Sequence, residues 1–261
     1  MILEGSNSFF CLFVLKYVWI RDDSMKKVAV VTGCAKGIGK EIALELARDG
    51  YDIIGTYNTS IDEVNNLKNR IESIGVNFSS YKLDLLNEEE ISNFCNDIKT
   101  NFNNIDILVN NAALSLDNTF QEKTIDEFRN VLQVNLISPF LLIQKLYNIM
   151  SNGVIINISS TDGINTYSKL NMDYSASKAG LINLTKSLAL ELKNIRLYAL
   201  CPNWVNTESI REMNQEYLKE EMNRIGQKNL IEPIDVAKKV INLIEINLKS
   251  GSIVVMEGKH E

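Results

Sequence analysis

The stretch Thr32–Gly39, with the sequence TGCAKGIG, decides the fold of this chain. It follows a short apolar run, Val28–Val31, and leads into Ile38–Arg48, where the apolar residues recur at helical spacing. A continuous apolar run before a glycine turn is typical of a strand buried on both faces of a sheet. Glycines between a strand and a helix permit a tight turn and let a pyrophosphate approach the free amides of the helix. The stretch therefore predicts a phosphate-binding turn between a first strand and a first helix.

Strand-like and helix-like segments alternate along the rest of the chain. We expect further strands at Asp52–Thr56, Asn77–Leu83, Ile107–Val109, Val154–Ile158, Arg196–Leu200 and Ile253–Met256. We expect helices at Ser60–Ser73, Asn87–Phe102, Thr124–Met150, Tyr174–Lys193 and Pro233–Ile246. Strict alternation of this kind indicates parallel strands joined by helical crossovers. The predicted fold class is α/β, a single doubly wound Rossmann-type domain of about seven parallel strands with helices on both faces.

Three of these helices carry start signals in the sequence. Ser60–Glu63 and Thr124–Glu127 both have the S/T-x-x-E pattern of a capping box, in which a hydroxyl and a carboxylate satisfy the first helical amides. Asn87 precedes three glutamates, which suit the positive end of a helix. We therefore expect side-chain caps at all three positions.

Composition excludes several classes of function. The 261 residues carry a net charge of −6, which argues against binding to a nucleic acid duplex. The single histidine, His260, lies next to the last residue, so multi-histidine metal sites are excluded and a Ser-His-Asp triad is not expected. The four cysteines are scattered without a CxxC pair, which indicates buried thiols in a reducing, cytoplasmic compartment. We predict no metal site.

Residues 1–24 stand apart from the rest of the chain. Phe9–Ile20 is an apolar run interrupted by Lys16, too short to span a bilayer as a helix of about 20 residues. It also lacks the basic start and small-residue cleavage site of a secretory signal. We interpret residues 1–24 as an upstream extension outside the fold, with Met25 as the natural start of a domain spanning 25–261. The alternative is a weak anchor lying in a membrane surface; no integral membrane association is expected.

Several further motifs follow the glycine-rich turn along the chain. They are Asn110–Ala113, Asn135 within VNL, Ser159–Ser160, Tyr174–Lys178 with the YxxxK pattern, and Pro202–Thr207. In this order the motifs resemble the short-chain dehydrogenase/reductase family of NAD(P)-dependent oxidoreductases, over residues 26 to about 258. Two positions depart from the family pattern, since Ala113 and Asn203 each replace a glycine. Asn203 could narrow the nicotinamide end of the site, although asparagine tolerates left-handed backbone conformations.

The resemblance implies catalytic roles for Ser160, Tyr174 and Lys178. Tyr174 and Lys178 are four residues apart and so share one helix face. A nearby ammonium stabilises a phenolate, and we therefore expect the pKa of Tyr174 to fall below its usual value of about 10. Tyr174 would be the general acid in ketone reduction, Ser160 would hydrogen-bond the substrate carbonyl, and Lys178 would also hold the nicotinamide ribose. Taken alone, a YxxxK pair is by default an ordinary surface pair.

Asn135 is the fourth expected catalytic residue. Pro139 follows it by four residues inside an expected helix and has no N–H to donate to the Asn135 carbonyl. We therefore expect a kink there. The resemblance implies that Asn135 sits at a helix distortion and holds a water in a proton relay to the lysine.

The resemblance also implies a set of cofactor-binding residues: Gly33, Lys36, Gly37, Ile38, Gly39, Asp84, Leu85, Asn111, Ala112, Lys178 and Thr207. NAD enzymes usually place an acid after the second strand to bind the ribose 2′-hydroxyl. The stretch Gly55–Ser60 has no acid, whereas Lys36 matches the basic residue that faces a 2′-phosphate. We therefore predict NADP(H) in preference to NAD(H).

The leading function is reduction of a small carbonyl substrate, in the style of the 3-oxoacyl-acyl-carrier-protein reductases. A substrate on an acyl-carrier protein would need an exposed basic patch, to which Arg129 or Lys169 could contribute. The alternatives are a sugar, polyol or steroid alcohol dehydrogenase, and a dinucleotide sensor that has lost the chemistry. Glu208–Ile231 is the expected lid over the substrate, with most of its charges on a solvated face. The family's final strand, here Ser252–Gly258, often forms oligomers, so we expect a homodimer or homotetramer.

Overall fold

The computed structural model describes residues 26–258. The strands are β1 (Lys27–Val31), β2 (Tyr51–Tyr57), β3 (Phe78–Lys82), β4 (Ile107–Asn110), β5 (Val154–Ile158), β6 (Arg196–Pro202) and β7 (Ser252–Met256). The α-helices are α1 (Gly37–Arg48), α2 (Ile61–Ile74), α3 (Glu88–Asn101), α4 (Ile125–Leu132), α5 (Ser138–Leu146), α6 (Met172–Glu191), α7 (Glu208–Glu212), α8 (Gln215–Ile225) and α9 (Pro233–Glu245). The expected extension 1–24, the start at Met25 and His260 lie outside the described residues, and the domain boundary stays a prediction.

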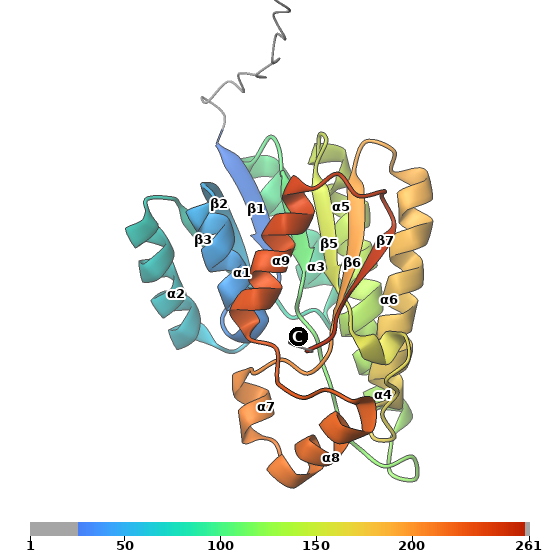
Figure 1. The fold of residues 1–261 in the computed structure, drawn as a ribbon. Helices are drawn as coiled ribbons and strands as arrows, with labels where there is room; N and C mark the ends of the chain where they lie inside the picture. Colours follow the sequence, from blue (N-terminus) through green and yellow to red (C-terminus); the bar gives the residue numbers. More distant parts are fainter. Residues whose placement is uncertain (1–25, 259–261) are drawn as a thin grey trace, which may run out of the picture.

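The seven strands form one parallel sheet in the order β3-β2-β1-β4-β5-β6-β7. Val30 of β1 pairs with Ile54 of β2 on one side and with Leu108 of β4 on the other. The chain runs outward from β1 to β3 and then returns to β4, so the direction of winding reverses between β1 and β4. The carboxyl ends of the strands meet at the lower edge of the sheet in Figure 1. A reversal of this kind opens a crevice at that edge, where doubly wound sheets bind their ligands.

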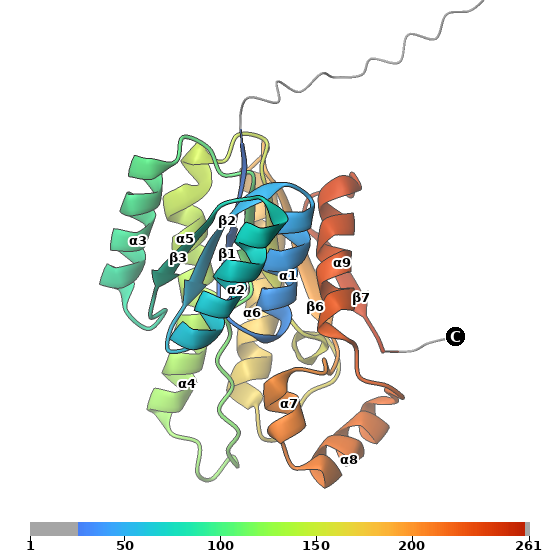
Figure 2. The same ribbon diagram turned by 90° about the vertical axis from the view of Figure 1, so that its left-hand side faces the viewer.

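Helices cover both faces of the sheet, which confirms the predicted fold class. Figures 1 and 2 show α1, α2 and α9 on one face and α3, α5 and α6 on the other. On the first face Ile42 and Leu46 of α1 pack in one core with Val240 of α9. On the second face Phe94 of α3 packs in a separate core with Leu142 of α5. Among residues 26–258, no helix is both long and apolar enough to cross a membrane.

Two of the three expected helix caps are formed. Asn87 accepts hydrogen bonds from the amides of Glu89 and Glu90, and Thr124 forms a complete capping box with Glu127. The capping box expected at Ser60 is wrong, because its side chain makes no cap hydrogen bond. The Ser60 backbone has ψ of 65° and so lies outside the extended conformation that aims an N-cap oxygen at the helix.

The single helix expected from Thr124 toward Met150 is divided into four parts. A π-helical turn, η1 (Gln133–Ile137), separates α4 from α5, and a 3₁₀ turn, η2 (Tyr147–Ile149), ends the segment. Pro139 occupies the first turn of α5, where a missing N–H costs least. The distortion thus lies where the proline predicts it, and it takes the form of a π bulge that keeps the helix continuous.

We predict that Gly39→Ala destabilises the turn between β1 and α1. A Cβ atom at residue 39 would lie 2.3 Å from the Gly33 carbonyl oxygen and 2.5 Å from Nδ2 of Asn111, so the backbone must shift. We expect the free energy of unfolding, measured by urea denaturation, to fall by about 2 kcal/mol or more. In the control Gly75→Ala nothing lies within 4 Å of the new methyl group, and only the left-handed backbone opposes it. The control should therefore lose about 1 kcal/mol; equal losses would contradict the steric explanation.

Candidate active site

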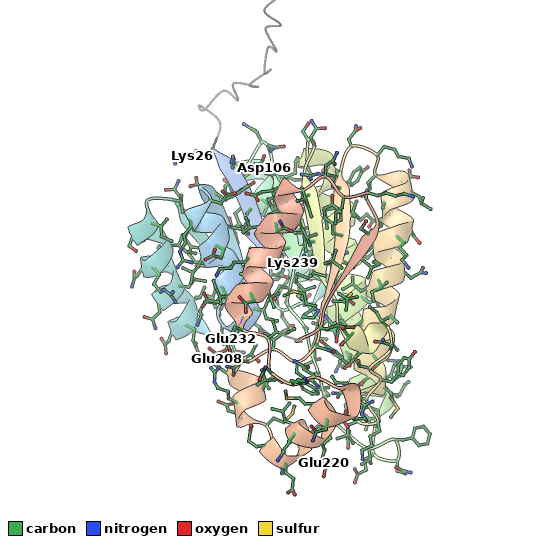
Figure 3. The ribbon with its side chains drawn as sticks, in the orientation of Figure 1. Lys26, Asp106, Glu208, Glu220, Glu232 and Lys239 are labelled. Carbon is green, nitrogen blue, oxygen red and sulfur yellow. The ribbon has the colours of Figure 1, made fainter. Side chains whose placement is uncertain are left out.

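A cleft of about 880 Å³ opens at the carboxyl ends of the strands, beside the reversal between β1 and β4. Twelve of the expected site residues line it: Gly33, Lys36, Gly37, Ile38, Asp84, Leu85, Asn111, Ala112, Ser160, Tyr174, Lys178 and Thr207. The other two, Gly39 and Asn135, lie behind its wall. Figure 3 places Glu208 at this edge of the sheet and Lys26 and Asp106 at the opposite edge. The structure therefore brings residues from almost the whole length of the described chain into one cleft.

The glycine-rich turn lines the cleft at the start of α1. Gly33 and Gly37 have φ of 63° and 57°, a conformation that favours glycine. A Cβ atom at Gly33 would lie 2.9 Å from Cα of Ala112, so the β1 and β4 loops approach closely here. Lys36 is the N-cap of α1, and its side chain caps none of the helical amides. The first amides of α1 thus have no cap from the Lys36 side chain and suit an acceptor from outside the helix, such as an anion.

The Glu208 carboxylate lies at these amides in the structure. Its Oε2 is 3.8 Å from the position of a Cβ on Gly37, and its Oε1 is 3.8 Å from Nζ of Lys40. Burial alone would raise the pKa of Glu208, but hydrogen bonds from the amides of Glu208 and Gly37, with the charges of Lys40 and Arg211, lower it. A carboxylate therefore already occupies the anion-binding end of α1, and a phosphate group fits the same chemistry.

Ser160, Tyr174 and Lys178 come together at the other end of the cleft. The side chain of Ser160, in the turn after β5, hydrogen-bonds to Tyr174 of α6. Lys178 is 2% exposed, and its Nζ donates a hydrogen bond of 2.8 Å to the Ile158 carbonyl. The same Nζ lies 5.3 Å from the centroid of the Tyr174 ring. The neighbouring Ser159 hydroxyl donates to the Lys178 carbonyl, so Ser160 is the serine beside the tyrosine.

The pKa of the Tyr174 hydroxyl is raised above 10, which is opposite to the expected direction. Burial is the largest cause, and the Asp162 carboxylate adds to it, while the hydrogen bond with Ser160 works against it. The Lys178 ammonium lies over the ring and is itself desolvated, which lowers the pKa of Lys178 to about 8. The expectation therefore omitted the effect of burial, and the tyrosine keeps its proton at neutral pH.

Asn135 lies in the π-helical turn η1 and holds one wall of the cleft through hydrogen bonds. Its side chain accepts a hydrogen bond of 2.8 Å from the Leu114 amide and donates one of 2.9 Å to the Leu114 carbonyl. Its Nδ2 also lies 3.0 Å from Oγ of Ser177 on α6. The side chain thus fixes the loop after β4, where Leu114 lines the cleft. The proton relay expected through Asn135 stays a prediction.

The end of β2 carries the features that decide which dinucleotide fits. Asn58, Thr59 and Ser60 line the cleft after β2 and provide no carboxylate. The Lys36 ammonium projects beside them and lies 3.9 Å from the carboxylate of Glu63, with both side chains about half exposed. Sequence reasoning missed Glu63, which could have been found by placing the first turn of α2 at the carboxyl edge of the sheet.

Two further polar residues contribute to the catalytic end. Asp162 lines the cleft two residues after Ser160, accepts a hydrogen bond of 2.6 Å from Thr166 and is close enough to influence Tyr174. Sequence reasoning missed Asp162, although its place just after a buried strand was a usable signal. Thr161 donates a hydrogen bond to the side chain of Asn203. Asn203 has no positive φ, so the replacement of glycine there introduces no backbone strain.

The expected lid, Glu208–Ile231, contains α7 and α8 below the carboxyl ends of the strands (Figure 1). Ile210 and Met213 of this segment line the cleft. Arg224 of α8 pairs with Glu221 at 2.6 Å and donates to the Thr166 carbonyl at 2.8 Å. Because Thr166 also contacts Asp162, α8 is connected to the turn that carries Ser160.

Comparisons with known proteins agree with this geometry. A sequence model of the family described as short chain dehydrogenase matches residues 27–218. A 3-oxoacyl-[acyl-carrier-protein] reductase from Buchnera aphidicola is 34% identical over 84% of this chain and 89% of the relative. Another from Aquifex aeolicus is 35% identical over 83% and 89%. Among solved structures, a short chain dehydrogenase from Burkholderia cenocepacia in complex with NADP superposes with a TM-score of 0.80, at 26% identity over 89% of this chain and 96% of the other.

We predict that Lys178→Met stabilises the protein without cofactor at neutral pH. Burial lowers the pKa of Lys178 from its ordinary 10.5 to about 8, so the folded state binds fewer protons between these values. The unfolding free energy of the wild type should therefore rise with pH across this window, and the full penalty, up to about 3 kcal/mol, applies below pH 8. The variant has no buried charge and so lacks this penalty, but it loses the hydrogen bond to Ile158. We therefore expect its free energy of unfolding to be higher by about 1–2 kcal/mol at pH 7.

The measurement is chemical denaturation of both proteins at pH 7 and pH 10. The difference between wild type and variant should shrink or reverse at pH 10, because the wild-type lysine is then largely neutral in the folded state. A difference that does not change with pH would contradict the assigned titration.

Proposed function

Because this chain belongs to the short-chain dehydrogenase family and is an NAD(P)-dependent oxidoreductase, we propose that it reduces a ketone to a secondary alcohol with NADPH. The observation that carries the proposal is that Ser160, Tyr174 and Lys178 lie in the same cleft as the glycine-rich turn. One end of the cleft offers amides for phosphates, and the other offers a proton donor. The combination suits a dinucleotide extended along the cleft with its reactive ring near Tyr174.

NADPH, when bound, supplies the hydride. Residues of this chain bind the substrate oxygen and supply its proton. In the absence of substrate the Ser160 and Tyr174 hydroxyls interact with each other; a substrate carbonyl that replaces this interaction can accept one hydrogen bond from each of them, on the oxygen where negative charge develops as hydride arrives. The proton then passes from Oη of Tyr174 to that oxygen. Burial raises the pKa of Tyr174, so its hydroxyl carries the proton that reduction requires.

A preference for NADPH is supported by the charges around the end of β2. The Lys36 ammonium stands at the cleft, and the residues that follow β2 provide no acid to accept from a ribose 2′-hydroxyl. An ammonium attracts a 2′-phosphate. Glu63 partly neutralises Lys36 in the structure, so the 2′-phosphate must compete with its carboxylate. The Burkholderia relative is solved in complex with NADP, which agrees with this preference.

For the substrate we propose a 3-oxoacyl thioester, as in the named relatives from Buchnera and Aquifex. The apolar side chains of Trp204, Ile210 and Met213 line the substrate end and suit an acyl chain. A sugar, polyol or steroid alcohol is the second candidate, because the Asp162 carboxylate beside Tyr174 could accept from a substrate hydroxyl. Two exposed basic residues, Arg129 and Lys169, could contribute to a surface that binds an acyl-carrier protein. Of the two, Arg129 also pairs with Asp126.

Exposed apolar side chains support a homo-oligomer. Leu190 on α6 is 73% exposed, and Val255 on the edge strand β7 is 44% exposed. We propose a dimer or tetramer that covers them.

Cys34, Cys95 and Cys201 are free and buried, which suits a reducing compartment, and we propose the cytoplasm.

We predict that Tyr174→Phe lowers kcat by a factor of about 10² to 10⁴, because it removes only the proton donor. The assay follows NADPH oxidation with a panel of 3-oxoacyl thioesters, ketoses and simple ketones. NADPH affinity, followed through the fluorescence of Trp204 in the cleft, should stay within about threefold of the wild type. Full turnover by the variant would contradict the role of Tyr174. A wild type that binds NADPH but reduces none of the panel would favour the alternative, a dinucleotide sensor.

We predict that Lys36→Met lowers the ratio of kcat/KM for NADPH over NADH by about tenfold, since one charge pair with the 2′-phosphate is lost. Glu63→Gln should raise the same ratio, because it frees Lys36 from its carboxylate partner. Steady-state kinetics with both cofactors provides the measurement. As a control, Lys68→Met removes a lysine on the exposed side of α2, where it pairs with Glu72 at 3.8 Å, and should leave the ratio unchanged. A wild type that prefers NADH would refute the proposal.

A further inference from the structure

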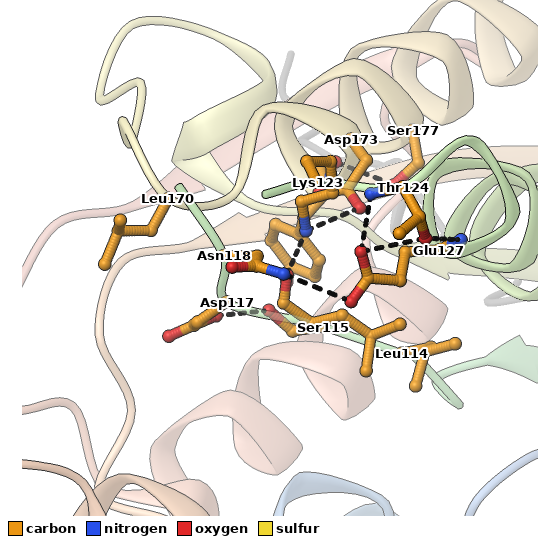
Figure 4. A network of polar contacts seen from close by, with 12 residues as sticks. Leu114, Ser115, Asp117, Asn118, Lys123, Thr124, Glu127, Leu170, Asp173 and Ser177 are labelled. Atoms are coloured by element: carbon orange, nitrogen blue, oxygen red, sulfur yellow. Dashed lines mark hydrogen bonds and ion pairs between the residues drawn. The ribbon is translucent and has the colours of Figure 1, made fainter. Parts of the chain in front are cut away.

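A buried ion pair lies behind the catalytic end of the cleft, outside the residues that touch it. Nζ of Lys123 is 3.0 Å from Oδ2 of Asp173, and the two side chains are 4% and 0% exposed. Figure 4 shows the pair at the centre of a polar network between the loop after β4 and the start of α6. Oδ2 of Asp173 has no hydrogen-bond donor among the described residues, so the ammonium is the group that compensates its burial.

Each partner also holds a backbone group at the site. Asp173 immediately precedes Tyr174, and its Oδ1 accepts a hydrogen bond of 2.9 Å from the Tyr174 amide. The N-cap of α6, Asn171, makes no side-chain cap, so Asp173 satisfies an amide of the first turn that would otherwise lack a partner. Lys123 donates a hydrogen bond to the Leu116 carbonyl. The pair thus joins the backbone of the catalytic tyrosine to the loop opposite it.

That loop forms one wall of the cleft. Residues 111–115 and Asp117 line the cleft, and the loop is held at three successive points. Asn135 holds Leu114, Lys123 holds Leu116, and the Asn118 amide donates to the Leu170 carbonyl at 3.1 Å. Two of these contacts continue through side chains to the start of α6: Asn135 hydrogen-bonds to Ser177, whose hydroxyl donates to the Tyr174 carbonyl, and Lys123 pairs with Asp173, which accepts from the Tyr174 amide.

Stability alone does not account for a pair of this kind. Two buried charges lose their hydration, and a well-packed apolar pair of similar volume is often as stable or more so. What the charges provide is a specific geometry, since each must face the other in a medium where misalignment is costly. In catalysis a displacement of about 1 Å can cost about 10²-fold in rate.

We infer that Lys123 and Asp173 are positioning residues, which set the Tyr174 hydroxyl relative to the opposite wall of the substrate site. The inference rests on the proposed function in that Tyr174 is the proton donor. Loss of the pair should impair the chemical step and leave cofactor binding intact, because within residues 26–258 neither side chain forms a hydrogen bond or ion pair with an expected cofactor-binding residue.

The test uses three variants of the full chain: Lys123→Met, Asp173→Asn and the double variant. Each single change leaves one charge buried without its partner, so both should lower the melting temperature and lower kcat by about 10-fold to 100-fold. The double change removes both charges and should recover most of the melting temperature while kcat stays low. NADPH affinity should remain within about threefold throughout. Lys68→Met, which breaks the exposed pair with Glu72, is the matched control and should change nothing.

A purely structural role predicts a different result. In that case kcat would return together with the melting temperature in the double variant, or would not fall in the single variants, and either outcome would overturn the inference. Hydrogen exchange of the backbone provides a readout that needs no turnover. Amides of residues 114–118 and of the first turn of α6 should exchange faster in the double variant than in the wild type. If the wild type reduces no substrate in the panel, the proposed function fails, while unchanged exchange would reject the positioning role independently.

Discussion

The structure depends on the close approach of two loops where the winding of the sheet reverses. Gly39 allows α1 to begin against the Gly33 carbonyl and the side chain of Asn111, with no space for a methyl group. Nδ2 of Asn111 donates to the carbonyls of Thr32 and Gly33 at 2.9 and 3.1 Å, and the Thr32 hydroxyl accepts from the Asn111 and Ala112 amides at 3.0 Å. These contacts join β1 to β4 at the reversal. They fix the helix amides and the opposite loop as two sides of one cleft.

The catalytic end of that cleft is held by buried polar groups. Nζ of Lys178 donates a hydrogen bond to the Ile158 carbonyl. The Asn135 side chain hydrogen-bonds to Leu114 and Ser177, and Lys123 forms a buried ion pair with Asp173. Such groups are expensive to bury, and each is acceptable only where its partner is in place. The site therefore tolerates little independent movement of its parts, which is what proton transfer between prepositioned groups requires.

The fold could be predicted from local patterns because its strands are buried on both faces. Val154–Ile158 is apolar except for the buried Asn157, and β5 spans the same residues. That the residues expected to bind the cofactor would lie at one edge was also predictable, since most of them follow strands directly. Contacts between distant segments were not, because Lys123 and Asp173 are fifty residues apart and carry no shared motif. The pKa direction of Tyr174 failed for a related reason: helical spacing places an ammonium nearby but says nothing about desolvation.

Glu208 connects α1 to α7 at the edge of the cleft. Its carboxylate lies at the N-terminal amides of α1, while its backbone begins α7, the first helix of the lid. An anion that binds these amides would compete with the Glu208 carboxylate for the same hydrogen-bond donors. The same carboxylate connects the first turn of α7 to α1, so the position of one side chain couples the anion-binding end of α1 to the neighbouring helix.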